Sequence, residues 1–403
     1  MKDRRNILLI LISLLPPLVS EGMLWQFGLT DSVLGILQIL DCALIAALYV
    51  LYRQKPSVPM VILGMVYATV FGSALFHDII VTAVGNFVGG LAMCMVFDFW
   101  LKREYDRFLA VCHVVLVILV LANLGTVILF PEGMYKDSVY SNNWLLGHKN
   151  AHAAYIMSAL LVDVIQSYRK VGKIGIPSLC LMVLCCTSLY LVDALMSLFM
   201  ASGFSAVTIL LVNRQERREI RFFLRMFSLK TVIAVTLVVF LGVILMNHIP
   251  TLLSLVTQLS NALGRQTPFN GRVPIWNAAM DLIAASPLIG YGMVPAERFV
   301  ELSCIHGGTH AHNYLLNLLI MGGAVCLLEH MGLYFVTIRR LDRNRGFGAY
   351  AMNLVIGLYF FAGITNVNFY SELFNPLFVL AYYVAGNCAA GTNGPVRRVY
   401  KWQ

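Results

Sequence analysis

The sequence predicts an all-α, polytopic membrane protein with about 12 transmembrane helices and a structured extracytoplasmic cap loop of amphipathic helices. The first observation is composition: of 403 residues, 59% are hydrophobic and only 12% are charged, whereas a soluble domain carries about 25% charged residues. The second is arrangement, because apolar runs alternate with short basic segments. These features exclude a cytosolic enzyme, a disordered chain and a disulfide-built secreted module, and the basic segments do not indicate a nucleic-acid partner.

Twelve apolar segments are candidate membrane spans. The first follows Lys2, Arg4 and Arg5, as in a signal peptide, but residues 14–20 offer no small-x-small cleavage site. We therefore expect an uncleaved first span. The twelve segments cover residues 6–20, 33–52, 58–75, 79–100, 108–130, 151–167, 175–192, 195–212, 230–248, 312–336, 349–366 and 371–389.

The basic residues fall mostly on one side of this threading. One set of loops holds 24 of the 29 Lys and Arg residues, and the other holds only Lys136, Lys149, Arg265, Arg272 and Arg298. By the positive-inside rule, the first set and both termini are cytoplasmic, in a multi-pass protein of the cytoplasmic (inner) membrane. The chain then divides into nine spans over 1–248, an extracytoplasmic cap loop over 249–311, and three spans with a cytoplasmic tail over 312–403.

The cap loop contains two amphipathic patterns. Apolar residues recur at helical spacing over 251–264 and again over 272–286, where the apolar stripe comprises Ile275, Trp276, Ala279, Leu282 and Ile283. We expect two helices lying on the outer membrane face. Turn residues separate them at 268–271 and end the second helix at 287–292.

Three motifs follow one another in this loop: Gly271-Arg272-Val273-Pro274-Ile275-Trp276, Ser286-Pro287-Leu288-Ile289-Gly290-Tyr291-Gly292, and His310-Ala311-His312-Asn313. The run resembles the O-antigen ligase and polysaccharide polymerase superfamily, whose members carry a long extracytoplasmic loop late in a bundle of ten to fourteen spans. Gly147-His148-Lys149-Asn150 also fits that family. Ligases usually carry an Arg just after a serine in a mid-chain span, and residues 187–194 contain none, which favours a polymerase.

The resemblance implies a metal-independent glycosyltransferase of cell-envelope polysaccharide synthesis (capsule, exopolysaccharide or O-antigen) that needs no cofactor. Its donor would be a polyprenyl-diphosphate-linked oligosaccharide, such as one on undecaprenyl diphosphate, and its acceptor a sugar hydroxyl, or lipid A core for a ligase. A flippase and a chain-length regulator would be further partners. Two alternatives stay open: a flippase of lipid-linked oligosaccharide, for which two related halves would be expected, and a scaffold without chemistry.

Arg272 is the leading candidate for binding the donor diphosphate. Negative charge grows on the phosphate oxygens as the leaving group departs, and a guanidinium stays charged and offers phosphate a planar fork of donors. Arg265 and Arg298 are second candidates, although cations on interfacial helices also extend toward lipid headgroups. The other predicted substrate-binding residues are Lys149, Trp276, His310 and Asn313.

His312 is the predicted general base that removes the proton of the attacking hydroxyl, because imidazole titrates in a suitable range. His310 is two residues away, so both rings would face one side if the segment is extended and would diverge in a helix. Glu372 is an alternative base. Zinc binding by Cys304, His306, His310 and His312 is disfavoured, because their spacing matches no standard zinc site.

The charge distribution yields a topology prediction. A reporter fused after Gln403 should be cytoplasmic, and one inserted near Pro268 should be extracytoplasmic. Paired alkaline phosphatase and fluorescent-protein fusions measure both sides. If both reporters are found on the same side, the twelve-span threading is wrong.

Overall fold

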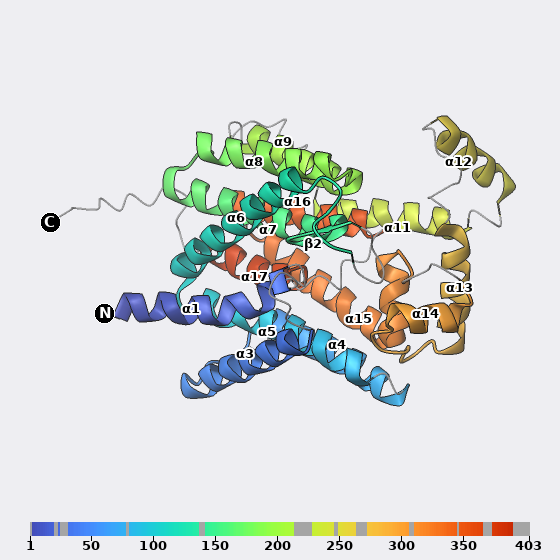
Figure 1. Cartoon of the computed structure of the whole chain (residues 1–403), viewed down its shortest axis with the longest axis horizontal. Helices are drawn as coiled ribbons and strands as arrows, with labels where there is room; N and C mark the ends of the chain where they lie inside the picture. The colour runs from blue at the N-terminus through green and yellow to red at the C-terminus, as the bar shows by residue number, and fades with distance from the viewer. Residues whose placement is uncertain are drawn as a thin grey trace.

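The computed structural model is helical along nearly all of the chain that it describes, which comprises residues 2–19, 23–24, 31–77, 80–136, 142–212, 228–245, 249–262, 272–305, 310–344, 346–365 and 373–389. Every predicted span contains a helix. These helices are α1 (Lys2–Leu18), α3 (Asp31–Leu51), α4 (Val58–Phe76), α5 (Ile80–Arg103), α6 (Tyr105–Leu129), α7 (Lys149–Val171), α8 (Ile176–Leu191), α9 (Leu195–Val212), α11 (Leu229–Leu245), α15 (Tyr314–Asp342), α16 (Phe347–Ala362) and α17 (Pro376–Ala389) (Figure 1).

Several of these helices fit an integral membrane protein. Within the described part of the chain, four segments are long and apolar enough to cross a membrane: Val33–Leu51, Val58–Phe76, Tyr105–Leu129 and Tyr314–Asp342. Large apolar side chains are also exposed on the outside of the bundle, as expected of a lipid-facing surface; examples are Leu40, Val50, Ile118, Val183 and Val238. The full number of twelve spans and their orientation stay predictions.

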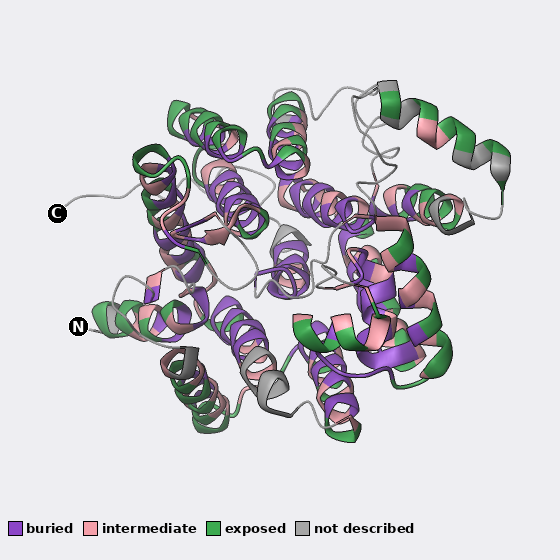
Figure 2. Cartoon of the chain, turned by 45° about the vertical axis from the view of Figure 1, so that its right-hand side comes forward, coloured by how far each residue is buried: buried purple, intermediate pink, exposed green. Residues whose placement is uncertain are grey.

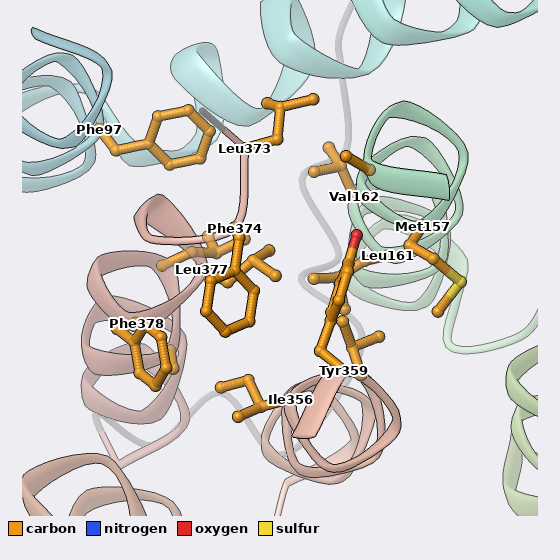
Figure 3. Packing of buried hydrophobic residues seen from close by; sticks show 14 of the residues in the cluster. Phe97, Met157, Leu161, Val162, Ile356, Tyr359, Leu373, Phe374, Leu377 and Phe378 are labelled. Carbon is orange, nitrogen blue, oxygen red and sulfur yellow. The ribbon is translucent and has the colours of Figure 1, made fainter. Parts of the chain in front are cut away.

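The core of the bundle lies where α15, α16 and α17 meet the earlier helices. Figure 2 shows the buried faces of the helices turned toward one another and the exposed faces outward. Aromatic rings dominate the centre: Phe374 packs against Tyr359 at 5.2 Å and against Phe378 at 5.5 Å between ring centroids, beside Leu161 and Val162 of α7 (Figure 3). Rings of this kind bury large apolar areas and hold helices at fixed spacing.

A short hairpin precedes α7. Strands β1 (Asn143–Trp144) and β2 (Gly147–His148) pair antiparallel, and the Trp144 indole N–H donates to the Phe130 carbonyl at 2.8 Å. His148 is the N-cap residue of α7, in an extended conformation and without a side-chain cap hydrogen bond. The hairpin therefore fixes the position at which Lys149 begins the helix.

In the described part of the predicted cap, the helices are α12 (Pro250–Ala262), α13 (Arg272–Ala285) and α14 (Ala296–Ser303). The two predicted helices are therefore present, and α14 is an addition. The apolar stripe of α13 does not lie on a membrane surface, because Trp276, Ala279 and Leu282 are buried against other parts of the protein, including Leu316 and Ile320 of α15. Leu255 of α12 is more than half exposed, and this helix lies apart from the bundle (Figure 1).

Helix α15 is interrupted in its middle, where the sequence predicted one continuous span. Gly322 and Gly323 have non-helical backbone angles, so the helix cannot pair its own amides and carbonyls there. Residues 286–292, here named the bridging loop, supply the missing partners. Two loop amides donate to helix carbonyls and two helix amides donate to loop carbonyls: Tyr291 N to Ile320 O (2.7 Å), Gly292 N to Met321 O (2.8 Å), Ala324 N to Pro287 O (2.8 Å) and Val325 N to Leu288 O (3.3 Å).

Three glycines make this close approach possible. Gly290, Gly292 and Gly323 all have positive φ, the region that side chains disfavour. A methyl group would overlap the Ile320 carbonyl at Gly290, Ala74 at Gly292 and the Leu288 carbonyl at Gly323. Unpaired backbone groups are costly in a lipid environment, so the loop and the interrupted helix require each other.

The break gives a stability prediction. Gly323→Ala should lower the free energy of unfolding by about 2 kcal/mol or more, because it adds both a backbone conformation reserved for glycine and an overlap with Leu288. Gly332→Ala is the matched control in the same helix, since a methyl group there meets nothing within 4 Å. Thermal unfolding in detergent measures both variants. Equal unfolding temperatures would show that the break does not depend on this contact.

Candidate active site

The segment before α15 holds three of the predicted site residues in a tight turn. Asn313 is the N-cap of α15: its side-chain oxygen accepts from the Leu316 amide at 3.1 Å, and its side-chain nitrogen donates to the Ile364 carbonyl at 3.0 Å. His312 has a φ of +47°, an uncommon conformation for a residue other than glycine. Such strain persists only where the surroundings impose it, and it concentrates at functional sites.

Arg272 reaches the same place from α13. It is the first residue of that helix, and its Nη1 donates to the carbonyl of Thr365, just after the end of α16. The Asn313 side chain binds the neighbouring carbonyl, that of Ile364. The start of α13, the start of α15 and the end of α16 therefore meet at two successive peptide groups, which brings Arg272 beside the turn with His310 and His312.

The two histidine rings lie side by side, with centroids 4.0 Å apart. The two rings therefore face one side, as they would not in a helix, although the positive φ of His312 makes the backbone bend there and not extend. Burial, followed by the positive charge of Arg272, lowers the pKa of His312 to about 4. The pKa of His310 is lowered to about 3 by burial, by His312 and by Arg272. Both imidazoles are therefore neutral at physiological pH and able to accept a proton.

Trp276 follows Arg272 by one helical turn, and Ala311 lies between the two histidines. Both are buried in a second apolar cluster that also contains Tyr291, Phe299 and Leu316. The cluster unites α13, the bridging loop, α14 and the start of α15. Trp276 is 2% exposed, so its side chain is part of this apolar cluster, and a direct contact with substrate stays a prediction.

The other predicted residues are placed elsewhere or lie outside the described ranges. Arg298 is exposed on α14 and forms an ion pair with Glu301 at 2.7 Å. Lys149 donates to the Asp193 carbonyl at 3.2 Å, near the turn between α8 and α9. Arg265, His306 and Glu372 lie outside the residues that the structure describes. Where it does describe the chain, no group of three His, Cys, Asp or Glu side chains is arranged to bind a metal ion.

Two features of the site escaped the sequence analysis. The carbonyls of Ile364 and Thr365, which position Asn313 and Arg272, belong to a segment with no motif of its own. The interruption of α15 did have a signal, because Gly322-Gly323 is a turn-forming pair inside an apolar run.

The charge of Arg272 makes the histidines sensitive to its removal. Arg272→Gln should raise the pKa of both His312 and His310, because protonation no longer meets a neighbouring cation. Arg298→Gln, which removes a cation that is paired with Glu301, should leave both values unchanged. NMR titration of isotope-labelled histidine measures them. If the pKa values of His310 and His312 are unchanged in Arg272→Gln, the guanidinium does not act on the two histidines.

Comparison with known protein families is consistent with this geometry. No curated protein matches the chain. Residues 180–328 match a family model described as O-antigen ligase, and this region includes α13, the bridging loop and the turn with both histidines. The match confirms the resemblance carried by the three motifs. Over residues 180–328, the chain is therefore similar to the O-antigen ligase family, in the region that holds all three motifs.

Proposed function

We propose that this protein is a polysaccharide polymerase that transfers a glycan from a polyprenyl diphosphate to a hydroxyl of an acceptor sugar, on the outer face of the cytoplasmic membrane. The match of residues 180–328 to the O-antigen ligase family supports glycosyl transfer of the ligase or polymerase kind. The observation that carries the proposal is the convergence of Arg272 with two neutral histidines at one turn. A cation for the leaving group and a base for the nucleophile are what this reaction requires.

Arg272 acts on the leaving group. The acceptor oxygen forms a bond to the anomeric carbon while the bond from that carbon to the phosphate oxygen breaks, and the diphosphate departs with the bonding electrons. A guanidinium can donate two parallel hydrogen bonds to phosphate oxygens. Its hydrogen bond to the Thr365 carbonyl fixes its direction before substrate binds, which lowers the cost of reorganisation during the reaction.

His312 takes the proton of the acceptor hydroxyl. Its low pKa in the free protein makes it neutral but weakly basic. A bound diphosphate would oppose the charge of Arg272 and favour the imidazolium, so the pKa of His312 should rise when the donor is present. The base is thus strengthened when the donor is bound, and a pKa closer to the working pH makes proton transfer more efficient.

The preference for polymerase over ligase rests on the sequence of residues 187–194, which lacks the Arg usual in ligases. Lys149 contacts Asp193 in this stretch, so a lysine from α7 lies where the ligases carry their Arg. We include Lys149 as a second residue that contacts the donor phosphate. The ligase, with lipid A core as acceptor, is the alternative. A flippase accounts less well for a base and a cation at one turn. A separate flippase and a chain-length regulator would be partners of the polymerase.

Substitution of Arg272 tests the leaving-group role. Arg272→Lys should be nearly as damaging as Arg272→Ala, because a single ammonium cannot replace a planar fork of donors. Arg298→Lys is the matched control on α14 and should keep the wild-type rate. The assay is transfer by purified protein with lipid-linked repeat units, at equal membrane abundance. Full activity of Arg272→Lys would refute bidentate binding.

Substitution of His312 tests the base. His312→Ala should lower the rate of transfer by roughly 10²-fold or more, and His310→Ala should cost less. His312→Asn controls for the backbone, because asparagine tolerates positive φ, and it should be as inactive as His312→Ala. In the wild type, kcat/KM should be constant above the free-enzyme pKa of His312, about 4, and should decrease as the pH drops below that value. As the pH is lowered, kcat should begin to decrease sooner, because the bound donor raises the pKa of His312.

Three results would contradict this assignment. Retention of the rate in His312→Asn would remove His312 from the chemistry. If Glu372→Gln loses transfer activity while His312→Asn keeps the wild-type rate, the carboxylate of Glu372 is the base. Loss of transfer with EDTA in an otherwise unchanged assay would show that the reaction needs a metal ion.

A further inference from the structure

A basic pocket lies at the end of the bundle opposite the Arg272 site. It has a volume of about 540 Å³ and is lined by Tyr52, Arg53, Gln54, Lys55, Lys102 and Arg103, from the segment after α3 and the end of α5. Beneath it, Asp98 accepts a hydrogen bond from Tyr383, next to Tyr382, over whose ring Arg340 lies. Arg340 is in the last turn of α15, whereas the Arg272 site is at the first turn.

Two cations of the pocket are held in place by contacts within the protein. The guanidinium of Arg103 lies 3.9 Å from the centroid of the Tyr52 ring, and the Lys102 ammonium donates to the Lys55 carbonyl at 2.8 Å. Arg53 has a φ of +48°, a strained conformation that turns the chain sharply after α3. Side chains that are already ordered lose less entropy when they bind an anion.

The nearest carboxylates are committed to other donors. Asp98 accepts from the hydroxyl groups of Tyr49 and Tyr383 at 2.6 and 3.0 Å, and from the Ser57 amide at 3.2 Å. Glu104 pairs with Arg107 at 2.6 Å and accepts from Asn6 at 2.8 Å. Among the residues described, no ion pair involves Arg53, Lys55, Lys102 or Arg103. Four positive charges therefore surround one hollow without a compensating carboxylate.

The surface next to the pocket is apolar. Val50 and Leu51, the last residues of α3, are 79% and 72% exposed, and they directly precede Tyr52. An apolar helix end followed by a tyrosine and several cations is the pattern of a membrane interface, where acyl chains meet headgroups. A soluble anion would use the cations but would leave this apolar surface uncovered.

We propose that this basic pocket binds the phosphate group of an anionic membrane lipid, whose acyl chains lie along the exposed end of α3. The cations contact the phosphate oxygens as charge-assisted donors, and Val50 and Leu51 contact the chains. The site is independent of glycosyl transfer and concerns the face of the bundle opposite to Arg272.

The test compares two variants with the same loss of charge. In the pocket variant, Arg53, Lys55, Lys102 and Arg103 are all changed to Gln. In the scattered control, Arg4, Arg5, Lys173 and Arg343 are changed to Gln; these side chains are exposed and do not line the pocket. Lys55→Glu is a milder third variant. Native mass spectrometry of the detergent-solubilised full-length protein measures binding of phosphatidylglycerol, with phosphatidylcholine as the neutral lipid and with inorganic phosphate as the soluble competitor.

The wild type and the scattered control should bind phosphatidylglycerol in preference to phosphatidylcholine. Each cation near a headgroup is worth about fivefold in affinity, so Lys55→Glu should lose at least that factor and the pocket variant should lose the preference. Equal losses in the pocket variant and the scattered control would overturn the proposal, because they would reflect general basicity. Complete displacement of the lipid by millimolar phosphate would also overturn it, in favour of a site for soluble anions.

Discussion

The backbone pairing between the bridging loop and the interrupted helix α15 is the constraint on which the rest of the structure depends. Four hydrogen bonds replace those that α15 cannot make around Gly322 and Gly323. Because the bridging loop directly follows α13, the same bonds fix α13 against α15. Arg272 begins α13, and His312 lies two residues before the start of α15. Their proximity therefore depends on the break at Gly322 and Gly323, which neither residue adjoins in the sequence.

The chemistry of the site follows from its enclosure. Burial removes water from the histidines, and the nearby guanidinium of Arg272 also disfavours their protonation. Because both imidazoles are neutral, the positive charge of Arg272 is left to attract an anion. In the proposed mechanism, donor binding activates the base through the electrostatic interaction of the diphosphate with Arg272 and His312.

The sequence was most informative about local features. Apolar runs located the bundle helices that the structure describes. The spacing of Trp276, Ala279 and Leu282 identified the buried face of α13 correctly, although not what buries it. The motifs also selected the residues that meet at one turn. Hydrogen bonds between residues far apart in the sequence could not be predicted, because nothing near Arg272 indicates that it binds a carbonyl 93 residues away. The break in α15 was only partly predictable, because the Gly322-Gly323 pair indicates a turn whereas the apolar run around it predicts a continuous span.

The central claim is that Arg272 and His312 act on the same transition state. A double-mutant cycle of Arg272→Ala and His312→Ala, measured as kcat/KM for glycan transfer by the purified protein, tests this most directly. Groups that act as a unit are strongly non-additive. The account therefore predicts that the double variant is about as slow as the slower single variant. Independent losses that multiply in the double variant would contradict it.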